Sequence, residues 1–274
     1  MKKRELIMLG TGNAMVTQCY NTCFIIKLES GDYFLTDGGG GNGILRQLEL
    51  ACVDYGRLHH MFVTHGHSDH IFGVIWVIRK IASLMAKGTY AGEFHLYCHD
   101  VVARMITDIA GMVLKKGDRA RLGTDIHIHV VEPGQTVEFL GLSLVPFDIG
   151  STKAKQFGYT LTFADGQKLT CLGDEPYAAQ CRDYAYGSDW LLSEAFCLYE
   201  ERQRFKPYEK HHSTVKEACE DAAGLGVPNL VLYHTEDADL AHRKGRYEAE
   251  GRRYYGGNLC VPDDLERIEL RAFY

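Results

Sequence analysis

The sequence contains no long apolar run and no cysteine pair of the Cys-x-x-Cys kind. No segment reaches the roughly 20 apolar residues that a membrane-spanning helix needs. The opening Met1–Gly10 has a basic start, but its apolar stretch is too short for the core of a signal peptide. Nine cysteines that occur singly fit reduced thiols better than a disulfide framework. We therefore expect a soluble cytoplasmic protein with no membrane partner.

Basic residues are too few for a protein that grips a long nucleic acid over a broad surface. The 274 residues include 30 lysines and arginines against 36 aspartates and glutamates, which gives a formal net charge of −6. This balance argues against contacts with many phosphates along an RNA. With 46% hydrophobic residues, the chain can bury a substantial core. No internal repeat or proline-rich linker interrupts it, which favours a single domain over residues 1–274.

Short apolar runs bounded by glycine or charge predict strands, and longer apolar segments predict helices. The segment Ile71–Ala86 has no internal proline and is followed by Gly88, which is typical of a largely buried helix. Two halves that each contain strands and helices indicate an α/β protein with αββα layers. The other expected helices are Val101–Leu114, Tyr177–Tyr186 and Ser213–Leu225, and the expected strands are Glu5–Leu9, Thr22–Leu28, Tyr33–Thr36, Met61–Thr64, Phe94–Tyr97, Ile126–Val131, Thr136–Phe139, Leu142–Phe147, Tyr159–Phe163, Lys168–Leu172 and Leu230–Tyr233.

Three histidines and an aspartate are crowded between a predicted strand and a predicted helix. They are His65, His67, Asp69 and His70, at the end of the strand Met61–Thr64. Imidazole nitrogens and carboxylate oxygens are ligands of zinc and related metals. Residues two apart on an extended chain face the same way, so His65 and His67 can share one ion. Asp69 and His70 lie past the turn and can reach another. Crowding four polar groups for packing alone is costly, so the spacing predicts two metal ions.

Two other features have ordinary structural explanations. The alternation in Ile126–Val130 places His127 and His129 on one face of a strand, which is the usual pattern of a half-buried strand. We do not expect these two histidines to be ligands. The run Gly38–Gly41 has no lysine or hydroxyl of a nucleotide-binding loop. It is expected to let the backbone approach the metal turn closely.

Five motifs, in order along the chain, resemble the metallo-β-lactamase superfamily and within it the ribonuclease Z-like and phosphodiesterase branch. The resemblance covers nearly the whole chain. It implies a four-layer αββα sandwich and a metal-dependent hydrolase that uses a metal-activated water. The motifs are Leu9–Asn13 with Asn21, Thr36–Gly41, the histidine motif, Cys171–Asp174, and the series Asp189–Ala195, His212–Thr214 and Leu232–His234.

The resemblance also implies the metal ligands. Two divalent ions are expected, with zinc favoured and manganese or iron as alternatives. Such a pair of ions can clamp a phosphoryl oxygen and activate a shared water. One ion would be held by Asp69, His70 and His234 and the other by His65 and His67, with Asp174 bridging the two.

The chain departs from the branch at two places. The branch has a third histidine in its first site where this chain has Gly150 or Ser151, so we expect that site to bind its ion weakly. His99 and His211 are candidate substitutes, although a surface position is the expected interpretation of both. At Ser193–Phe196 the branch has histidine, glutamate, alanine and threonine, of which this chain keeps only the glutamate and the alanine.

The resemblance implies proton transfer by the kept glutamate. Glu194 with His212 would orient or protonate a leaving group. The alternative is that Glu194 is a buried structural partner of His212. Asp69 could also accept the proton of the nucleophile while it binds the metal.

The substrate and the function stay open within this framework. The branch's long glycine- and proline-rich arm for transfer RNA is missing, so a small-molecule or nucleotide-like phosphodiester is favoured over a large RNA. Residues 76–121 contain several lysines and arginines and form either a solvated helical face, which we favour, or a cap insertion over the substrate. Alternative functions are hydrolysis of another ester or lactone on the same centre, and ligand binding without turnover by a degenerate family member. A homodimer is possible but not required.

Overall fold

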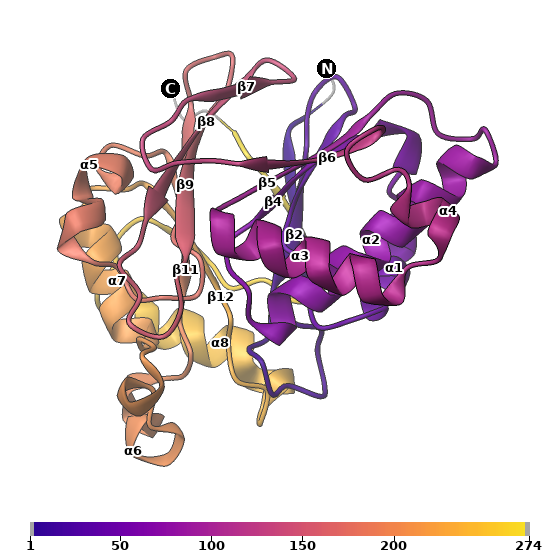
Figure 1. Ribbon diagram of the computed structural model, residues 1–274. Helices are drawn as coiled ribbons and strands as arrows, with labels where there is room; N and C mark the ends of the chain where they lie inside the picture. The colour runs from indigo at the N-terminus through magenta and orange to yellow at the C-terminus, as the bar shows by residue number, and fades with distance from the viewer. Residues whose placement is uncertain (1–2, 272–274) are drawn as a thin grey trace. The chain divides into compact units, whose positions relative to one another are not determined.

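Residues 3–271 are the part of the chain that the computed structural model describes. They divide into two compact units, which Figure 1 allows the reader to follow by colour. Unit 1 comprises residues 3–10, 20–131 and 264–271, and unit 2 comprises residues 11–19 and 132–263. Within this range each unit has one mixed sheet of seven strands together with helices. The expected α/β class is confirmed.

The sheet of unit 1 is antiparallel on one side and parallel on the other. The antiparallel part runs from β14 to β3 and the parallel part from β3 to β6. A parallel neighbour requires a long crossover connection, and these crossovers supply the helices of the unit. In spatial order the strands are β14 (Arg267–Glu269), β1 (Glu5–Gly10), β2 (Cys23–Lys27), β3 (Tyr33–Thr36), β4 (Leu58–Val63), β5 (Phe94–Cys98) and β6 (Ile126–Val130).

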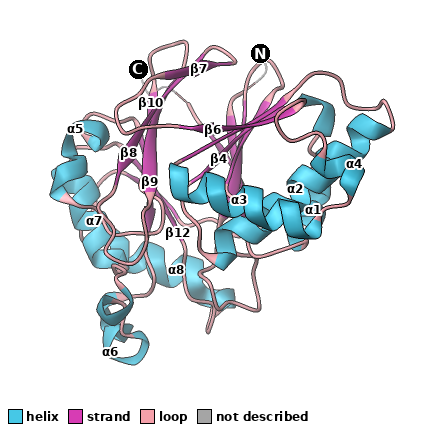
Figure 2. Cartoon of the chain, in the orientation of Figure 1, coloured by secondary structure: helices cyan, strands magenta, loops and turns pink. Residues whose placement is uncertain are grey.

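Three helices cover one face of this sheet, as Figure 2 shows in cyan. Apolar side chains of the helices, such as Ile44, Val74 and Ile106, share one buried cluster with Leu35 and Met61 of the strands. The second helix begins three residues before the predicted start, because its first turn takes in the polar end of the histidine motif. The helices are α1 (Gly43–Leu50), α2 (Ser68–Ala86) and α3 (Asp100–Val113), together with the short α4 (Lys116–Arg119).

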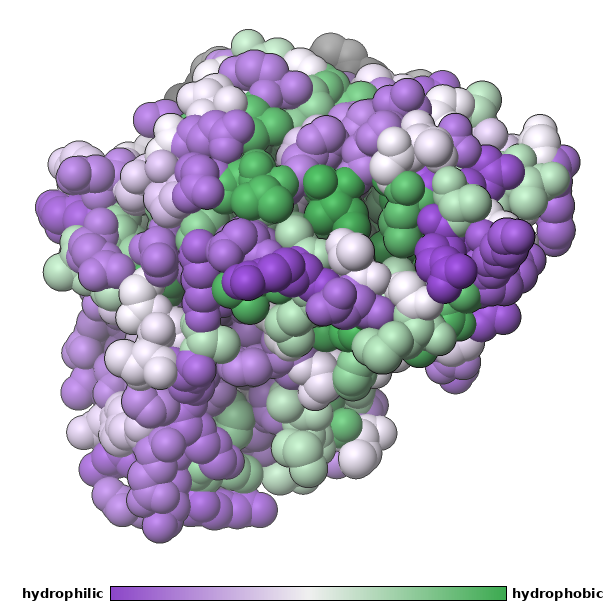
Figure 3. Space-filling model, viewed as in Figure 1, coloured by the Kyte–Doolittle hydropathy of each residue, from purple (hydrophilic) through white to green (hydrophobic). Residues whose placement is uncertain are grey.

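Residues 76–121 belong largely to the framework of unit 1. They supply most of α2, all of β5, and the helices α3 and α4, and β5 is an interior strand between β4 and β6. The side chains of Phe72, Trp76 and Val113 line part of a groove of about 400 Å³ beside α2 and α3. Figure 3 shows hydrophobic and hydrophilic atoms interspersed over these helices and strongly hydrophilic atoms around α4. A role of this segment as a cap over a substrate stays a prediction.

Histidines line the opposite face of the parallel strands. Leu96 and Ile126 point toward the helices, so their neighbours along each strand point the other way. The register pairs His60 with His95, and His95 with His127. The ring centroids of these two pairs lie 5.2 and 5.4 Å apart, with interplanar angles of 21° and 17°. A row of stacked imidazoles, which we call the histidine row, therefore crosses β4, β5 and β6.

The His60 imidazole is expected to make the fold sensitive to acid. Burial and the charges of His95, His59 and His129 lower its pKa from 6.5 to about 4. The unfolded chain then takes up a proton that the folded chain excludes, so stability falls as the pH drops from 6.5 to about 4. Because the ring is partly solvated, we expect the free energy of unfolding to fall by about 2 kcal/mol over this pH range. In denaturant titrations with EDTA present, His60→Gln should lose less stability with acid than the wild type, and His242→Gln should match the wild type. If the free energy of unfolding depended on pH equally in all three proteins, His60 would not be the source of the acid sensitivity.

The sheet of unit 2 repeats the same pattern. Its antiparallel part runs from β7 to β10 and its parallel part from β10 to β13. The parallel strands are central to the site described below, because their carboxyl ends meet at one edge. In spatial order the strands are β13 (Asn258–Cys260), β12 (Asn229–Tyr233), β11 (Trp190–Glu194), β10 (Lys168–Cys171), β9 (Phe157–Thr162), β8 (Leu142–Asp148) and β7 (Val137–Phe139).

The helices of unit 2 pack on its sheet through one apolar cluster. Val215 and Cys219 of one helix and Tyr247 of another lie in this cluster with Leu191 and Leu230 of the strands. The helix predicted over residues 177–186 is wrong in extent, because a 3₁₀ turn and four α-helical residues are found there. Among residues 3–271, no helix is both long and apolar enough to cross a bilayer. The helices are α5 (Arg182–Ala185), α6 (Arg202–Phe205), α7 (Val215–Gly224) and α8 (Leu240–Gly251).

Candidate metal centre

The histidine motif lies in a short connection between a buried strand and a helix. Thr64–His67 joins β4 to α2. His67 takes the N-cap position of α2 in an extended conformation, with φ −67° and ψ 151°. Asp69 and His70 occupy the first turn of that helix. The four side chains predicted as ligands in unit 1 are therefore gathered at the carboxyl end of one strand.

Asp37 lies behind this motif and contacts two of its segments. It follows β3 with a φ of 59°, a left-handed conformation that aspartate tolerates. Its Oδ1 accepts the backbone N–H of Thr64 at 2.8 Å, and its Oδ2 accepts the Thr64 hydroxyl at 2.7 Å. The same Oδ2 lies 2.8 Å from His70 Nδ1. The sequence alone placed Asp37 in a glycine-rich turn and assigned it no role.

These contacts fix the tautomers of two histidines. A carboxylate only accepts, so the Thr64 hydroxyl donates its single proton to Asp37. That hydroxyl lies 3.0 Å from His65 Nδ1 and must therefore accept a proton from this nitrogen. His70 Nδ1 donates to Asp37 in the same way. Both imidazoles are left with a lone pair on Nε2, the atom that a metal ion would bind.

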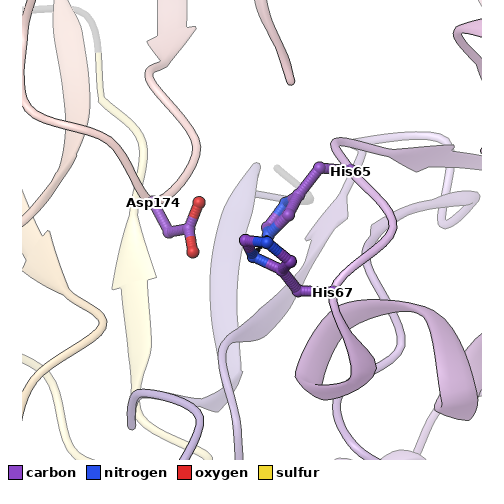
Figure 4. Close-up of side chains that lie close together, drawn as sticks. All are labelled: His65, His67 and Asp174. Atoms are coloured by element: carbon purple, nitrogen blue, oxygen red, sulfur yellow. Dashed lines mark hydrogen bonds between the residues drawn. The ribbon is translucent and has the colours of Figure 1, made fainter. Parts of the chain in front are cut away.

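His65 and His67 face each other across the loop, and Figure 4 draws both rings. His65 Nε2 lies 2.9 Å from His67 Nδ1, and the ring planes are 86° apart. His65 is fully buried, whereas His67 is half-buried. The prediction that residues two apart in this motif point the same way is confirmed. Their role as ligands stays a prediction.

Asp69 and His70 form a second contact pair in unit 1. Asp69 Oδ2 lies 3.4 Å from His70 Nε2, and both side chains are buried. Burial alone would lower the pKa of His70, but the carboxylates of Asp69 and Asp37 raise it well above its usual value. Without a metal ion the two carboxylates therefore favour a second proton on His70, at Nε2, and a metal ion bound there would replace that proton.

The glycine run Gly38–Gly41 packs directly on the first turns of α2. The N–H of Gly38 donates to the C=O of His70 at 2.9 Å. A Cβ on Gly38 would lie 2.3 Å from the backbone nitrogen of Val74, and one on Gly73 would lie 1.7 Å from the oxygen of Gly38. A larger residue at either glycine would push the turn away from the helix. The predicted close approach of this run to the metal turn is confirmed.

In unit 2 the predicted site residues gather at the carboxyl ends of parallel strands. β10, β11 and β12 are parallel neighbours, so these ends lie along one edge of the sheet. Asp174 follows β10, Glu194 ends β11, and His234 directly follows β12. Open α/β sheets commonly place binding sites at this edge. The topology therefore brings together residues that are far apart in the sequence.

Asp174 and His234 form the contact pair of unit 2 that resembles a metal site. Asp174 Oδ2 lies 3.5 Å from His234 Nε2, and both side chains are buried. The carboxylate, drawn in Figure 4, accepts a hydrogen bond from the side-chain amide of Gln156. The Tyr233 hydroxyl donates to the C=O of Gly173. Gln156 immediately precedes β9, the antiparallel neighbour of β10, and its role could not be predicted from the sequence.

Glu194 and His212 lie beside this pair. Glu194 Oε1 accepts the backbone N–H of Ser213 at 2.5 Å, and its Oε2 lies 3.5 Å from His212 Nδ1. The ring centroid of His212 lies 5.1 Å from those of both Phe196 and His234. Donor atoms of Glu194, His212 and His234 all lie within 4.8 Å of one another. Glu194 thus positions the segment before α7 and keeps His212 close to His234.

The loop near the expected third histidine contains a glycine in the left-handed region. Gly150 has a φ of 79°, and a Cβ there would lie 2.1 Å from Nε2 of the exposed Gln180 side chain. A histidine in place of this glycine would be disfavoured by the backbone conformation, whereas the Gln180 side chain could move aside. His211 is exposed and its Nδ1 lies 3.3 Å from Thr152 Oγ1 of the same loop. His99 lies in unit 1 at the N-cap of α3 and is fully buried, so the expectation of a surface histidine is wrong for it.

A pocket of about 350 Å³ opens beside this loop in unit 2. Ser151, Glu175 and His212 are among the side chains that line it. The Ser151 hydroxyl donates to Glu175 Oε1 at 2.7 Å, and Lys153 Nζ lies 3.2 Å from the same oxygen. A hydroxyl, a carboxylate and an imidazole thus line a space of small-molecule size, and the Lys153 ammonium group contacts the carboxylate.

The donor sets within the two units fit divalent metal ions. Bonds of roughly 2.0–2.2 Å in a tetrahedral site place ligand atoms roughly 3.3–3.6 Å apart. Two of the three ligand pairs have this separation. In the third pair, the two imidazole rings need to move apart slightly to reach it. The pairs are Asp69 with His70 at 3.4 Å, Asp174 with His234 at 3.5 Å, and His65 with His67 at 2.9 Å.

Known proteins match the chain over nearly its whole length. A ribonuclease Z from Pyrococcus abyssi is 25% identical over 312 residues, which cover 98% of this chain and 96% of the relative. The metallo-β-lactamase fold protein YhfI from Bacillus subtilis has a TM-score of 0.79 at 14% identity and covers 97% of this chain and 99% of its own. Zn²⁺-bound PqqB from Methylobacterium extorquens has a TM-score of 0.74 at 13% identity, and the match covers 97% of this chain and 100% of PqqB. The expected fold and the resemblance to ribonuclease Z are confirmed.

A family model gives the more specific assignment. The model of the Anti-Pycsar protein Apyc1 matches residues 4–238. This range takes in most of both units and every residue predicted as a metal ligand, from His65 to His234. The chain has the metallo-β-lactamase fold and belongs to the Anti-Pycsar protein Apyc1 family.

Proposed function

We propose that this protein is a metal-dependent hydrolase that cleaves a phosphodiester bond with a metal-activated water. The main support for the proposal is the distance between the two ligand atoms of each pair within a unit. In addition, the contacts of Asp37 fix the tautomers of two imidazoles, those of His65 and His70. The relative from Pyrococcus abyssi is a ribonuclease, and RNA is a chain of phosphodiesters. Because one fold hosts many chemistries, the residues of the site indicate this function and the fold alone does not.

The predicted ligands suit two divalent ions in one centre. Imidazole and carboxylate together favour zinc, with manganese and iron as alternatives, and PqqB binds Zn²⁺ on the same fold. When bound, such ions polarise a phosphoryl oxygen and lower the pKa of a shared water. We assign Asp69, His70 and His234 to one ion and His65 and His67 to the other, with Asp174 bridging.

The two ions are proposed to differ in affinity. Gly150 occupies the loop in which the ribonuclease Z-like branch has a third histidine. The ion of His65 and His67 therefore has fewer protein ligands, and its affinity depends more strongly on the tautomer that Thr64 and Asp37 impose on His65. We expect this ion to be lost first during dialysis against a chelator.

His212 is proposed to supply the proton for the leaving oxygen. Its Nδ1 lies 3.5 Å from the Glu194 carboxylate, which can hold a proton on that nitrogen and stabilise the charged ring. Nε2 is then the nitrogen that exchanges its proton with a substrate. Asp69 is proposed to accept the proton of the attacking water.

A small nucleotide-like phosphodiester is the proposed substrate. The pocket beside His212 has a volume of about 350 Å³, near the lower end of the usual range for small-ligand sites. The net charge of −6 disfavours a long anionic partner, whose affinity depends on many basic contacts. The ammonium group of Lys153, which contacts Glu175 and the C=O of Lys210, is proposed to meet a single phosphate.

The proposal is tested by metal reconstitution of the whole chain. The metal-free protein is loaded with zinc, manganese or iron and assayed on cyclic and linear nucleotide phosphodiesters, on a folded transfer RNA, and on a lactone and a carboxylic ester. We expect turnover of a small phosphodiester that a chelator abolishes and added metal restores. His212→Asn should lower kcat by about 10²-fold with little change in KM, as expected for loss of a general acid.

Each contrary outcome has a defined meaning. Turnover of the lactone or ester alone would assign the centre to a different substrate class. Fewer than about one tightly held ion per chain, together with no turnover of any compound, would favour ligand binding by a degenerate family member. Turnover that is unchanged by the chelator would overturn the metal-dependent mechanism.

A further inference from the structure

Four polar contacts in unit 2 converge on one buried guanidinium group. Arg243 belongs to α8 and is only 2% exposed. Its Nη1 donates to the Thr11 hydroxyl at 3.0 Å and to the Thr235 hydroxyl at 2.8 Å. Its Nη2 donates to the C=O of Pro262 at 2.6 Å and to Asp263 Oδ1 at 2.9 Å. Arg243 therefore connects α8 to three segments that are far apart in the sequence.

Thr235, one of these partners, directly follows the proposed metal ligand His234. The φ of His234 is 58°, in the left-handed region that residues other than glycine and asparagine seldom adopt. Such a conformation persists only where the neighbouring structure holds it in place. A shift of the Thr235 backbone would therefore also move the His234 imidazole, whose Nε2 lies 3.5 Å from Asp174 Oδ2.

The backbone of Thr235 is fixed on both sides by the segment that follows β1. Its N–H donates to the C=O of Thr11 at 3.0 Å. Its C=O accepts the backbone N–H and the side-chain amide of Asn13, both at 3.0 Å. The Nη1 group of Arg243 joins the same two chain segments through their threonine hydroxyls. The guanidinium group thus reinforces the pairing that holds the residue next to His234.

Attachment of α8 to the sheet does not by itself require this arrangement. The contacts with Pro262 and Asp263 already attach the helix to the segment after β13. A buried charged pair often contributes no more stability than apolar side chains of the same size. Both protons of Nη1 are used on the two hydroxyls, in a planar geometry that lysine cannot reproduce. These two contacts therefore favour a role in placing the segment that contains His234.

We propose that Arg243 is a positioning residue of the hydrolytic centre, which acts through Thr235 to hold His234 in the orientation that binds metal. This inference rests on the proposed function, because it concerns a ligand of that centre. In this role Arg243 contacts neither the metal nor the substrate. Loss of the contact should therefore weaken the ion assigned to His234 and lower kcat, with little change in KM.

The test separates the hydroxyl of Thr235 from its shape. Thr235→Val keeps a branched side chain and removes the hydroxyl that Arg243 contacts, whereas Thr235→Ser keeps the hydroxyl. Zinc affinity of the whole chain is measured by competition with a chromophoric chelator, and the His234 imidazole is followed by long-range ¹H–¹⁵N NMR. We expect Thr235→Val and Arg243→Lys to weaken the ion assigned to His234 by about tenfold or more and to shift the His234 resonances. Both should lower kcat by about tenfold, and Thr235→Ser should match the wild type.

A second arginine of α8 supplies the control for general damage to the helix. Arg246→Lys makes the same chemical change on a partly exposed side chain that pairs with Glu200 and Glu201, and it should leave zinc affinity and kcat unchanged. Denaturant unfolding in EDTA measures the stability of each variant, and zinc affinity is measured where every variant is folded. A loss of stability alone is what a purely structural anchor predicts.

Two results would overturn the proposal. One is wild-type zinc affinity with unmoved His234 resonances in both Thr235→Val and Arg243→Lys, whatever their stability. The other is an equal loss in Thr235→Ser and Thr235→Val, which would assign the effect to packing. The zinc and NMR measurements need no substrate. If the wild type binds zinc and cleaves no phosphodiester, the proposed function fails, while weaker zinc binding by Thr235→Val still supports the role of Arg243.

Discussion

Replacing His234 with asparagine is expected to lower kcat/KM for the phosphodiester by more than about 10³-fold. His234 has a φ of 58°, which asparagine tolerates, so the change removes the imidazole without straining the backbone. The substitution removes the nitrogen that lies 3.5 Å from Asp174 Oδ2. A single preorganised group is worth roughly 10²–10³ in rate, and a lost ligand also weakens the ion itself. The measurement is kcat/KM together with the metal content of each purified variant.

Matched variants separate this effect from general damage. His242→Asn makes the same chemical change on α8, where the side chain is 76% exposed, and should leave activity unchanged. Asp69→Ala removes a proposed ligand of the same ion and should match His234→Asn. Activity that survives either substitution in the proposed centre would rule that centre out.

Replacing Asp37 with asparagine is expected to weaken zinc binding by about 10- to 100-fold. One Asp37 carboxylate oxygen accepts both the Thr64 hydroxyl and His70 Nδ1. The other carboxylate oxygen accepts the Thr64 N–H. An amide has one accepting oxygen and an NH₂ group that only donates, so it loses either the contact of Oδ1 or both contacts of Oδ2. Where the NH₂ group takes the place of Oδ2, His70 would carry its proton on Nε2, where the metal should bind. Loss of two buried hydrogen bonds to a charged group should also lower the free energy of unfolding by about 3 kcal/mol.

The stability and metal affinity of this variant need separate measurements. Denaturant unfolding in EDTA reports the loss that is independent of metal, and zinc competition reports the affinity. Asp54→Asn is the control, because the Asp54 side chain is exposed and accepts the backbone N–H of Gly56 in a surface turn. Wild-type zinc affinity in Asp37→Asn would show that Asp37 does not orient the ligands.

The strands were predictable because their apolar runs are local features of the sequence. Tyr33–Thr36 has the predicted bounds, whereas β4 begins at Leu58, before the predicted Met61. The polar His59 and His60 conceal that start, since their environment comes from neighbouring strands. Helix α8 was not predicted, because its buried side chains include no apolar stripe. A buried arginine, Arg243, anchors it through hydrogen bonds that no periodicity indicates.

The site divides in the same way between local and distant features. His65, His67, Asp69 and His70 are adjacent in sequence, so their convergence could be predicted from one loop. The roles of Asp37 and Gln156 depend on which strands lie side by side, and a single sequence does not state this. The histidine row is a further case, because the alternation in β6 alone is ordinary and the stacking of its rings follows only from the pairing with β5.

The pairing of β1 with β14 limits the order in which the protein can be completed during synthesis. β1 is made more than 250 residues before β14, yet Leu6 lies opposite Ile268 in the sheet of unit 1. That sheet stays one strand short until residues 264–271 have left the ribosome. Until then, β1 presents unpaired backbone groups of the kind that recruit strands from other chains. A nascent chain stalled before residue 264 would thus contain every proposed metal ligand and still expose an aggregation-prone edge.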